Sequence, residues 1–552
     1  MRRFLTLCVL VLGGVAALAQ LPPTCYRISL SDKDSSPYSV SDPSAFLSER
    51  ALAKRARFNI PITDQDLPVN PQYLQQIKAL DNGIRLLCVS KWMNTVTIYC
   101  PDSTKLADIL ALPFVNDILP VANYDLSGQA APVSHDFYGQ PVARAVRDTL
   151  EPYDYGAGRA QIAIHNGHLL HNDGFRGDGM LIAVFDAGWN GADTSDFFRP
   201  LFESGQILGT RNLVPGPGMD NVFRGHYHGT IVTSTMAMRA GGALVGTAPE
   251  ASYFLIRSEN PYSEQLIEED FWAQAAEIAD SIGADVINSS LGYTTFGDFP
   301  QGDFTYADVD GVTSIASRAA TILGQKGVVV CISAGNDGNN EWHYIGHPAD
   351  AVDVLAVGAA DVEGNIGSFS SRGPSYDGRV KPDITSVGVN TACVWPGDFL
   401  GEGSGTSLAG PVAAGLCACL WQALPQKSSH EIMRIVRESG SCHHNPNDSL
   451  GYGIPDFYAA YTAHAHDGVA QHTPPPVAVY PNPCTAHLII PNRDLDILRV
   501  ELYSTDGRLV FSDRPGKDYF IRLDVRNLPS GFYVGRVLTG THQTGRFKIL
   551  KQ

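Results

Sequence analysis

In the middle of the chain, apolar segments of strand length alternate with helical patterns, and this alternation limits the fold more than any other feature. LIAVFD (181–186) and ASYFLIRS (251–258) are continuous apolar runs, as buried strands are. An amphipathic segment at 268–284 has helical spacing, and the strands VINSS (286–290) and DVLAVGAAD (353–361) follow. Strands joined through helices run parallel and need cover on both faces. We therefore predict an α/β domain with a parallel sheet and helices on both faces.

Polar residues stand where these predicted strands end. Asp186 ends LIAVFD, and Asn336 follows the apolar run VVVCIS. Ligands of open α/β sheets meet the carboxyl ends of strands, although a single aspartate there is more often a loop cap. His228 precedes an apolar segment of small residues, which predicts a histidine on the first turn of a buried helix, and His226 competes with it. Asp186, His228 and Asn336 are therefore candidate site residues.

The segment GEGSGTSLAGPVAAGLCACLWQAL (401–424) delivers one serine, Ser407, to the start of a stretch of small apolar residues. It predicts a loop followed by a buried helix, with Pro411 near the first turn, where its missing N–H costs little. A serine there has the positive end of the helix and free backbone N–H groups beside it. This suits a nucleophile whose attack generates an oxyanion, but serine is also a common helix cap.

The order Asp, His, Ser differs from that of α/β-hydrolases, where serine comes first, and of chymotrypsin, where histidine does. DAG around Asp186, HGT at 228–230, SAGN at 333–336 and GTSLAGP at 405–411 resemble the four signature blocks of the subtilisin-like serine peptidases. GTAPEA, VINSSLG, AVGA and KPD resemble structural segments of that family. The resemblance covers roughly residues 150–460.

This resemblance implies a role for each site residue. Ser407 would be the nucleophile, His228 the general base and then acid, and Asp186 the carboxylate that orients the imidazole. Asn336 would donate to the oxyanion, together with the backbone N–H of Ser407. Two segments would bind substrate, one pairing with its backbone and one forming the opposite wall of the specificity pocket; they are Ser290, Leu291 and Gly292, and Ser333, Ala334 and Gly335.

The sequence departs from the family pattern at three places. Ala187 replaces the usual hydroxyl residue after the aspartate, so one supporting hydrogen bond is expected to be missing. Leu408 stands where methionine is common, which conserves volume. Extra residues precede His228 and alter the rim of the cleft. None of these changes removes a catalytic atom.

Residues 1–19 have the features of a signal peptide. Arg2 and Arg3 precede a short apolar run that ends in Ala17-Leu18-Ala19, which predicts cleavage before Gln20. A membrane anchor is the alternative, but the run is short and no later run is long enough to span a bilayer. The chain is therefore expected to be exported.

Residues 20–125 predict a small α+β domain. Segment 84–100 reads as two strands around a polar turn, and 105–121 as a helix followed by a strand. A basic, amphipathic helix with Ser44 as candidate N-cap precedes them. Between a signal peptide and a hydrolase, such a domain is expected to be a pro-domain that assists folding and blocks the site. An ordinary accessory domain is the alternative.

The peptidase domain is predicted to span residues 126–464, followed by a proline-rich linker at 465–476. Residues 477–552 alternate apolar and polar residues between turns such as Asp506-Gly507, which indicates an antiparallel β-sandwich. Tyr480-Pro481-Asn482-Pro483, LYSTDGR, LPSGFY and FKILK resemble the sorting domain of the type IX secretion system. A partner in the secretion machinery is thus implied, with a carbohydrate- or protein-binding module as the alternative.

Composition limits the partners. A net charge of −17 argues against a nucleic-acid surface. No cysteines or histidines have zinc spacing, while Cys88 and Cys100 could pair across neighbouring strands. Calcium stabilises many members of the resembled family, but acidic loops such as DGNN (337–340) define no site. We expect a monomer that needs no cofactor.

Taken together, these features predict a secreted serine endopeptidase that acts on flexible protein or peptide chains. The alternative is a binding or adhesion protein on an inactive protease scaffold. The presence of Asp186, His228, Asn336 and Ser407 together favours the enzyme.

Overall fold

The computed structural model describes most of the chain as two compact units, residues 1–463 and 464–552. The described residues are 22–126, 153–216, 221–465, 477, 479–492, 497–505, 508–515, 520–539 and 544–552. The predicted signal peptide and nearly all of the predicted linker lie outside them.

Seven parallel strands form the central sheet of the first unit, in the order β13-β12-β11-β10-β5-β9-β6. In chain order the strands are β5 (Leu181–Asp186), β6 (Ile207–Asn212), β9 (Ser252–Arg257), β10 (Val286–Ser289), β11 (Val329–Ser333), β12 (Leu355–Ala360) and β13 (Ile384–Val387). β5 lies inside the sheet, with β9 and β6 on one side and β10 to β13 on the other. The first strand of the domain therefore borders the point where the strand order reverses, and ligands of such sheets bind at that point.

Helices cover both faces of this sheet. Leu181, Ala183 and Phe185 of β5 belong to the core beneath α8 (Glu268–Ile282) and α9 (Ile315–Gln325). The intervening Ile182 and Val184 belong to the opposite core. That core contains α7 (His228–Ala237), α10 (Thr406–Ala423) and α11 (Ser429–Glu438). Because both faces are buried, the strand is apolar throughout, and the predicted fold class is confirmed.

Short elements complete this domain. They are the helices α4 (Arg159–Ala163), α5 (Gly167–Asn172), α6 (Arg199–Glu203) and α12 (Phe457–His464), and the paired strands β7 (Arg239–Ala240) with β8 (Leu244–Val245) and β14 (Thr391–Trp395) with β15 (Phe399–Gly403). Among the described residues, no helix is both long enough and apolar enough to cross a bilayer.

The N-terminal domain (residues 22–126) is built on an antiparallel sheet in the order β2-β3-β1-β4. Its elements are β1 (Cys25–Leu30), α1 (Glu49–Arg57), α2 (Pro71–Ala79), β2 (Arg85–Ser90), β3 (Thr95–Tyr99), α3 (Leu106–Leu110) and β4 (Val115–Ala122). The predicted cap of the basic helix is wrong. Ser44 lies in a single 3₁₀ turn and donates to Asp42, whereas Ser48 Oγ accepts from the backbone N–H of Ala51 at 3.2 Å and caps α1.

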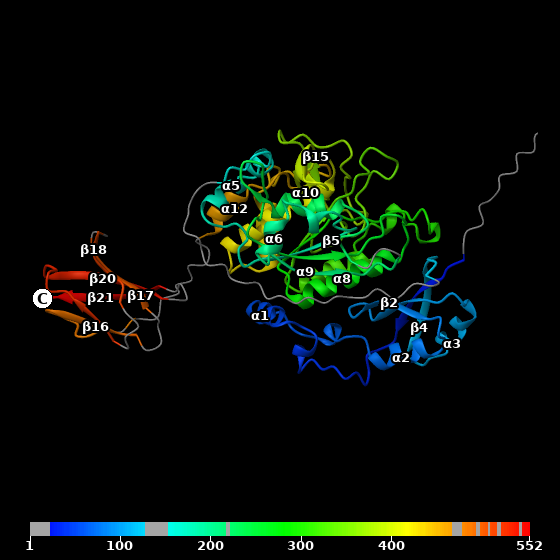
Figure 1. Ribbon diagram of the computed structural model, residues 1–552, viewed down its shortest axis with the longest axis horizontal. Coiled ribbons are helices and arrows are strands. Elements are labelled where there is room, and N and C mark those ends of the chain that lie inside the picture. Colours follow the sequence, from blue (N-terminus) through cyan, green and yellow to red (C-terminus); the bar gives the residue numbers. More distant parts are fainter. Residues whose placement is uncertain are drawn as a thin grey trace, which may run out of the picture. The chain divides into compact units, whose positions relative to one another are not determined.

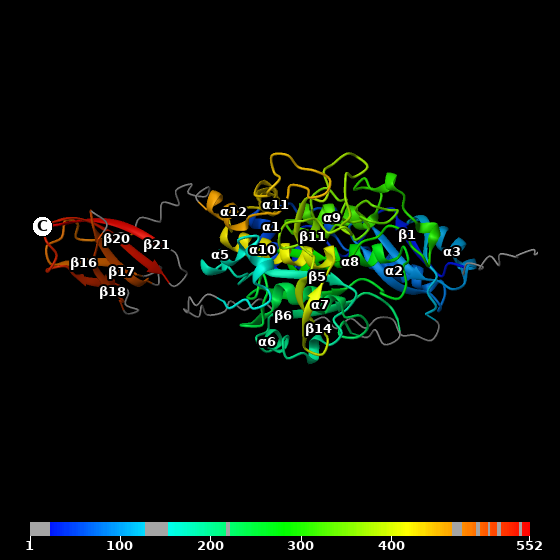
Figure 2. The ribbon, with the colours of Figure 1, turned by 90° about the horizontal axis from the view of Figure 1, so that it is seen from above.

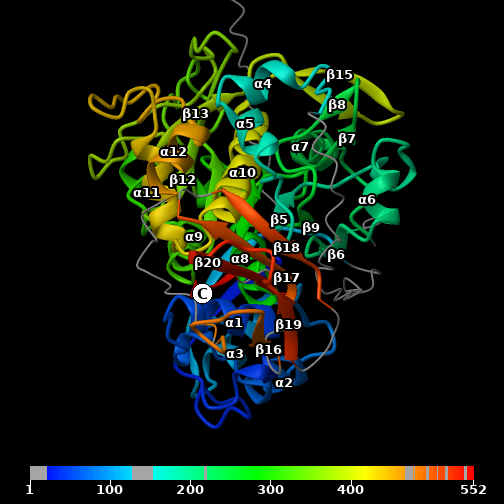
Figure 3. The same ribbon diagram turned by 90° about the vertical axis from the view of Figure 1, so that its left-hand side faces the viewer.

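The sheet of the N-terminal domain packs on α8 (Figure 1, Figure 3). Arg27 forms two hydrogen bonds to the Asp270 carboxylate, at 2.7 and 2.6 Å, and both side chains are buried. Glu277, about two turns further along the same face of α8, accepts from the backbone N–H groups of Lys91 and Trp92, each at 2.9 Å. The N-terminal domain therefore supplies hydrogen-bond donors to the Asp270 and Glu277 carboxylates of α8.

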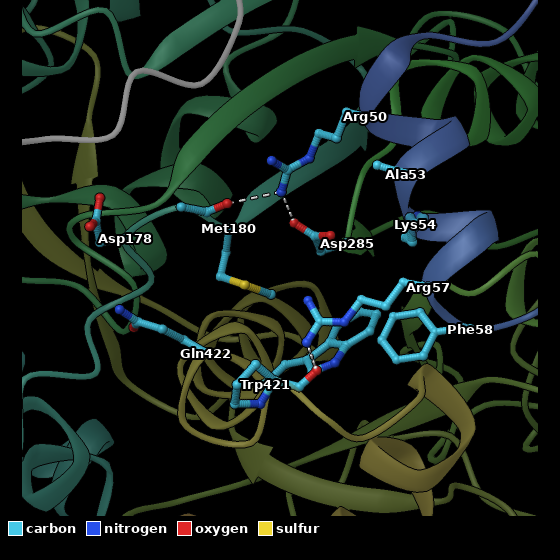
Figure 4. A pocket seen from close by; sticks show the side chains of 12 residues that line it. Arg50, Ala53, Lys54, Arg57, Phe58, Asp178, Met180, Asp285, Trp421 and Gln422 are labelled. Atoms are coloured by element: carbon cyan, nitrogen blue, oxygen red, sulfur yellow. Dashed lines mark hydrogen bonds and ion pairs between the residues drawn. The ribbon is translucent and has the colours of Figure 1, made fainter. Parts of the chain in front are cut away.

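α1 makes a second contact at the opposite edge of the central sheet, where the strands begin (Figure 4). Arg50 forms an ion pair with Asp285, directly before β10, and Arg57 donates to the carbonyl of Pro425. The Phe58 ring lies 6.0 Å from that of Trp421, between ring centroids. The N-terminal domain thus holds the central domain at two separate places.

The second unit consists of two antiparallel sheets around one core. β16 (His487–Pro491) pairs with β19 (Phe520–Asp524). β18 (Leu509–Asp513), β17 (Ile497–Ser504), β20 (Gly531–Thr539) and β21 (Thr544–Lys551) form the other sheet, in which β17, β20 and β21 lie side by side (Figure 2). Leu488, Leu502 and Ile549 meet in the shared core. This is the predicted strand-rich sandwich; the predicted turn at Asp506-Gly507 lies outside the described residues.

The nine cysteines within the described ranges are free thiols. Cys88 and Cys100 do not pair, because Cys88 belongs to the core beneath α8 and Cys100 to the core on the other face of the N-terminal sheet.

Candidate active site

Asp186 and His228 form a hydrogen-bonded pair at the carboxyl end of the sheet. Nδ1 of His228 lies 2.9 Å from Oδ1 and 3.1 Å from Oδ2 of Asp186. The carboxylate is fully buried, and a quarter of the histidine side chain is exposed. Because the carboxylate can only accept, the hydrogen resides on Nδ1, and the neutral ring presents Nε2 as a base.

The charge of Asp186 tunes this histidine. Burial alone would lower the pKa of His228, but the nearby carboxylate charge and its hydrogen bond outweigh burial and raise that pKa above its ordinary value. Asp186 Oδ1 also accepts from the Ala187 backbone N–H at 2.7 Å. The Ala187 side chain has no hydroxyl, so it cannot donate the further hydrogen bond that was expected to be missing at this position.

His226 does not take the place of His228. Its Nδ1 accepts from the backbone N–H of His228 at 3.2 Å, at the start of α7, where that N–H has no partner within the helix. Gly229, next in the chain, is required by close packing, because a Cβ there would lie 2.7 Å from the carbonyl oxygen of Gly188. His226 therefore positions His228 and does not replace it as the catalytic base, and Gly229 allows the close packing of the same turn.

Ser407 is the second residue of α10. Its Oγ makes a long hydrogen bond of 3.4 Å to the carbonyl of Ser290, and it lines the same pocket as His228. Pro411 was expected near the first turn of this helix, but it lies further inside, because the helix begins at Thr406. It cannot donate to the Ser407 carbonyl four residues back, and that carbonyl accepts instead from Ser290 Oγ at 2.9 Å.

Asn336 lies three residues after β11, and its amide is held in one orientation. Oδ1 accepts from the backbone N–H of Thr406 at 2.9 Å and from Thr406 Oγ1 at 3.1 Å. Since a backbone N–H can only donate, Oδ1 faces Thr406 and Nδ2 faces away. Within the described part of the chain Nδ2 has no acceptor, and Asn336 lines the pocket beside Ser407.

The chain reaches Asn336 through Gly335, whose φ is +107°. A Cβ at this position would lie 2.7 Å from Ser371 Oγ, so glycine is required for both reasons. The Gly335 N–H donates to Thr406 Oγ1 at 3.2 Å. The hydrogen bonds of Thr406 thus connect the segment after β11 to the start of α10.

The six predicted substrate-binding residues line one pocket of about 210 Å³ next to Ser407. Its other lining residues are Thr294, Asn336, Asp337, Gly346 and Thr406. The structure therefore brings together both predicted segments, which are separated by forty residues in the chain.

A second pocket of about 300 Å³ lies beside His228 and shares residues 290–292 and Ser407 with the first. Its remaining lining includes Ala187, Pro261 and two carboxylates, Glu259 and Glu264. These carboxylates and Thr406 were not among the site residues predicted from the sequence. Thr406 could have been predicted as a site residue, because it stands directly before Ser407. The two glutamates could not, because they follow β9 in a loop without a recognisable motif.

Among the residues that the structure describes, no three His, Cys, Asp or Glu side chains are grouped so that they could hold an ion.

Comparison with known families gives matches along most of the chain. A model described as the Subtilase family matches residues 177–453. One described as the Peptidase S8 propeptide domain, Bacteroidota, matches residues 25–134, and one described as the Secretion system C-terminal sorting domain matches residues 478–552.

Curated relatives agree with these matches. Serine protease AprX of Bacillus subtilis (strain 168) is 27% identical over 382 residues, covering 64% of this chain and 78% of the relative. Subtilisin BL of Lederbergia lenta is 30% identical over 291 residues, covering 52% of this chain and 93% of the relative. Membrane-bound transcription factor site-1 protease of Mus musculus is 31% identical over 259 residues, which is 46% of this chain and 22% of the relative.

Proposed function

Since the chain belongs to the subtilase family and is a serine endopeptidase, we propose that it cleaves peptide bonds through Ser407, His228 and Asp186. The observation that carries this proposal is the buried Asp186 carboxylate bonded to Nδ1 of His228, in a ring that faces the pocket of Ser407. The alternative of an inactive binding scaffold has no structural feature in its favour.

In the proposed mechanism, Ser407 Oγ attacks the carbonyl carbon of the substrate while its proton passes to Nε2 of His228. His228 then protonates the leaving amine, and an acyl-enzyme remains. Water attacks that ester in a second step with His228 again as base, which releases the acid and restores the serine. Asp186 keeps the ring in one tautomer and stabilises the imidazolium.

The oxyanion formed in each step would be bound by Asn336 Nδ2 and the Ser407 backbone N–H. The orientation set by Thr406 supports this role, because it turns the free donor of Asn336 toward the pocket. A donor fixed before the reaction needs no reorganisation when charge develops. The chemistry uses groups of the chain alone and requires no cofactor.

The sorting domain indicates export of the enzyme, to the cell surface or the medium. The N-terminal domain is a propeptide domain by its match, and its role is proposed to be that of a removable inhibitor. Protein or peptide chains with a flexible segment are the proposed substrates, cleaved by a monomer. An extended segment would pair with the backbone of residues 290–292.

Replacement of Ser407 by alanine tests the proposal. Wild type and variant, each freed of the N-terminal domain, are mixed with an unstructured protein, and the products are mapped by mass spectrometry. Triad members act as a unit, so activity is expected to fall by several orders of magnitude with the melting temperature unchanged. A folded variant that keeps more than about a hundredth of the activity would contradict the assignment.

A further inference from the structure

Two pockets share the candidate nucleophile and the segment 290–292, and their remaining lining residues differ. The first contains Asn336 and Ser407 and therefore adjoins the carbonyl that is attacked. The second contains His228, Glu259 and Glu264. In an extended peptide, successive side chains point to opposite sides. A substrate whose cleaved residue fills the first pocket therefore directs its preceding side chain toward the second.

We propose that this second pocket is a subsite for a cationic side chain, so that the enzyme prefers lysine or arginine directly before the residue whose carbonyl is attacked. The inference rests on the proposed function, since it assumes that substrate lies across Ser407. Glu259 is its principal determinant and Glu264 its outer carboxylate.

The carboxylates at this place have no positive partner. Within the described ranges, neither Glu259 nor Glu264 forms an ion pair. Glu268, at the start of α8, lies behind them within electrostatic range of both. It is fully buried, and within the described ranges no cation or side-chain donor pairs with its carboxylate, whose charge is stabilised only by backbone N–H groups of Gln265 and Asn260.

A buried carboxylate without a countercharge is costly, because a neighbouring positive charge does not offset its desolvation. Glu259 is half-buried and Glu264 is exposed, and their like charges repel each other and the charge of buried Glu268. A bound cation would relieve this repulsion. An ammonium or guanidinium group would supply the missing charge, and the guanidinium would also supply several donors. The cation expected here is therefore the substrate's own side chain.

The protonation state of the empty pocket agrees with this geometry. Burial, and then the charges of Glu264 and Asp186, raise the pKa of Glu259 to about 8. Burial, and then the charges of Glu259 and Glu264, raise the pKa of Glu268 well above its ordinary value. A cationic side chain favours the ionised form, so its binding releases a proton near neutral pH. The titratable groups within electrostatic range of Glu259 are Glu264, Glu268, Asp186, His228 and Tyr293, and His226 lines the same pocket.

Peptides that differ at only one position test the proposal. They carry arginine, lysine, norleucine or glutamate before a common cleaved residue, and kcat/KM is measured for each. Arginine and lysine are expected to exceed norleucine by about tenfold or more, since close charge pairs across interfaces reach this strength. Glutamate is expected to be the poorest. Equal hydrolysis of all four would overturn the subsite while leaving the proposed function intact, and no hydrolysis of any would overturn the proposed function itself.

Substitutions identify the residues responsible. Glu259→Gln is expected to bring the ratio of arginine to norleucine close to one. Glu264→Lys, at an exposed position that tolerates a charge, is expected to lower this ratio and to improve the glutamate peptide relative to norleucine. Glu363→Gln, in an exposed loop that lines neither pocket, is the matched control and should keep the wild-type ratio. An unchanged ratio in both Glu259→Gln and Glu264→Lys would contradict the inference.

The pH dependence separates this subsite from a merely shape-based preference. The ratio of kcat/KM for arginine over norleucine cancels the titration of His228, which both peptides share. Because Glu259 ionises with a pKa of about 8, the ratio should rise between pH 6 and 9 in wild type and be flat in Glu259→Gln. A ratio that is independent of pH in wild type would count against Glu259 as the determinant.

Discussion

Asn336 and Thr406 show how one backbone N–H can define a site at the scale of single residues. The Thr406 N–H fixes which end of the Asn336 amide faces the pocket. Replacement of Asn336 by leucine keeps the approximate size of the side chain and removes the donor. We expect kcat to fall about a hundred- to a thousandfold with little change in KM, the range for loss of one oxyanion donor.

Steady-state kinetics and melting temperature on the same preparation check this prediction. A purely structural Asn336 would give a lower melting temperature and a near-normal kcat, which would remove it from the catalytic set. Thr406→Ser is the control: it keeps both hydrogen bonds to Asn336 and should retain most of the wild-type kcat.

His228 predicts the pH profile of the enzyme. The ring is a base only when neutral, and Asp186 raises its pKa above the ordinary value. The rate should therefore be low in acid and rise with pH, with a midpoint of kcat/KM above 6.5 for a neutral peptide. A midpoint clearly below 6.5 would show that the carboxylate does not dominate the environment of the ring.

Sequence reasoning reached the triad residues because their motifs are local. Asp186 ends an apolar strand, and His228 and Ser407 each begin a helix. The same reasoning could not reach Glu259 and Glu264, because their importance comes from β9 lying next to β5 in the sheet. That neighbour relation is a property of strand order, and no residue near Glu259 signals it.

At the scale of elements, α8 is the helix of the central domain on which the sheet of the N-terminal domain packs. Asp270 and Glu277 are buried, and among the described residues the hydrogen-bond partners of both carboxylates belong to this domain. Breaking a buried ion pair by removing one partner costs about 3–5 kcal/mol, because the remaining charge stays desolvated. Arg27→Ala should therefore weaken inhibition of the mature enzyme by the separated N-terminal domain about a hundredfold or more.

Inhibition constants measured with the wild-type and variant domains test this expectation. Lys78→Ala, at an exposed position of α2, serves as the control and should inhibit as the wild type does. A wild-type domain that fails to inhibit at all would contradict its role as an inhibitor. An Arg27→Ala domain that inhibits as well as wild type would show that the pair with Asp270 contributes little.

Element existence was easier to predict than element ends. The strands and helices of the central domain follow from apolar runs and helical spacing. The cap of α1 was misplaced because Ser44 and Ser48 both precede the basic stretch, and only the 3₁₀ turn at Pro43–Ala45 decides between them. Pro411 was misplaced because α10 starts five residues before it, at Thr406, and Ser290 compensates for the lost hydrogen bond from another part of the chain.

At the scale of the whole molecule, the second unit has its own core and carries the match to a sorting domain. Within it, Asn482 accepts from the Leu550 N–H at 2.9 Å and donates to the Lys548 carbonyl at 2.8 Å, which ties the predicted Tyr-Pro-Asn-Pro motif to β21. Deletion of residues 477–552 should leave a folded, active protease that is retained in the periplasm.

Cell fractionation and peptide hydrolysis on the same cultures test this prediction. Full-length Ser407→Ala is the control, since it should be exported although it is inactive. Arrival of the truncated enzyme outside the cell in normal amounts would contradict the sorting role and favour a binding module.

The central claim is that Ser407 is a nucleophile activated by His228 and Asp186, and covalent labelling tests it most directly. The enzyme, freed of its N-terminal domain, is treated with a fluorophosphonate, and the labelled peptide is identified by mass spectrometry. The account predicts one label per molecule, on Ser407, with labelling abolished in Ser407→Ala and slowed by orders of magnitude in His228→Ala. A label on another residue, or equal labelling rates in wild type and His228→Ala, would contradict it.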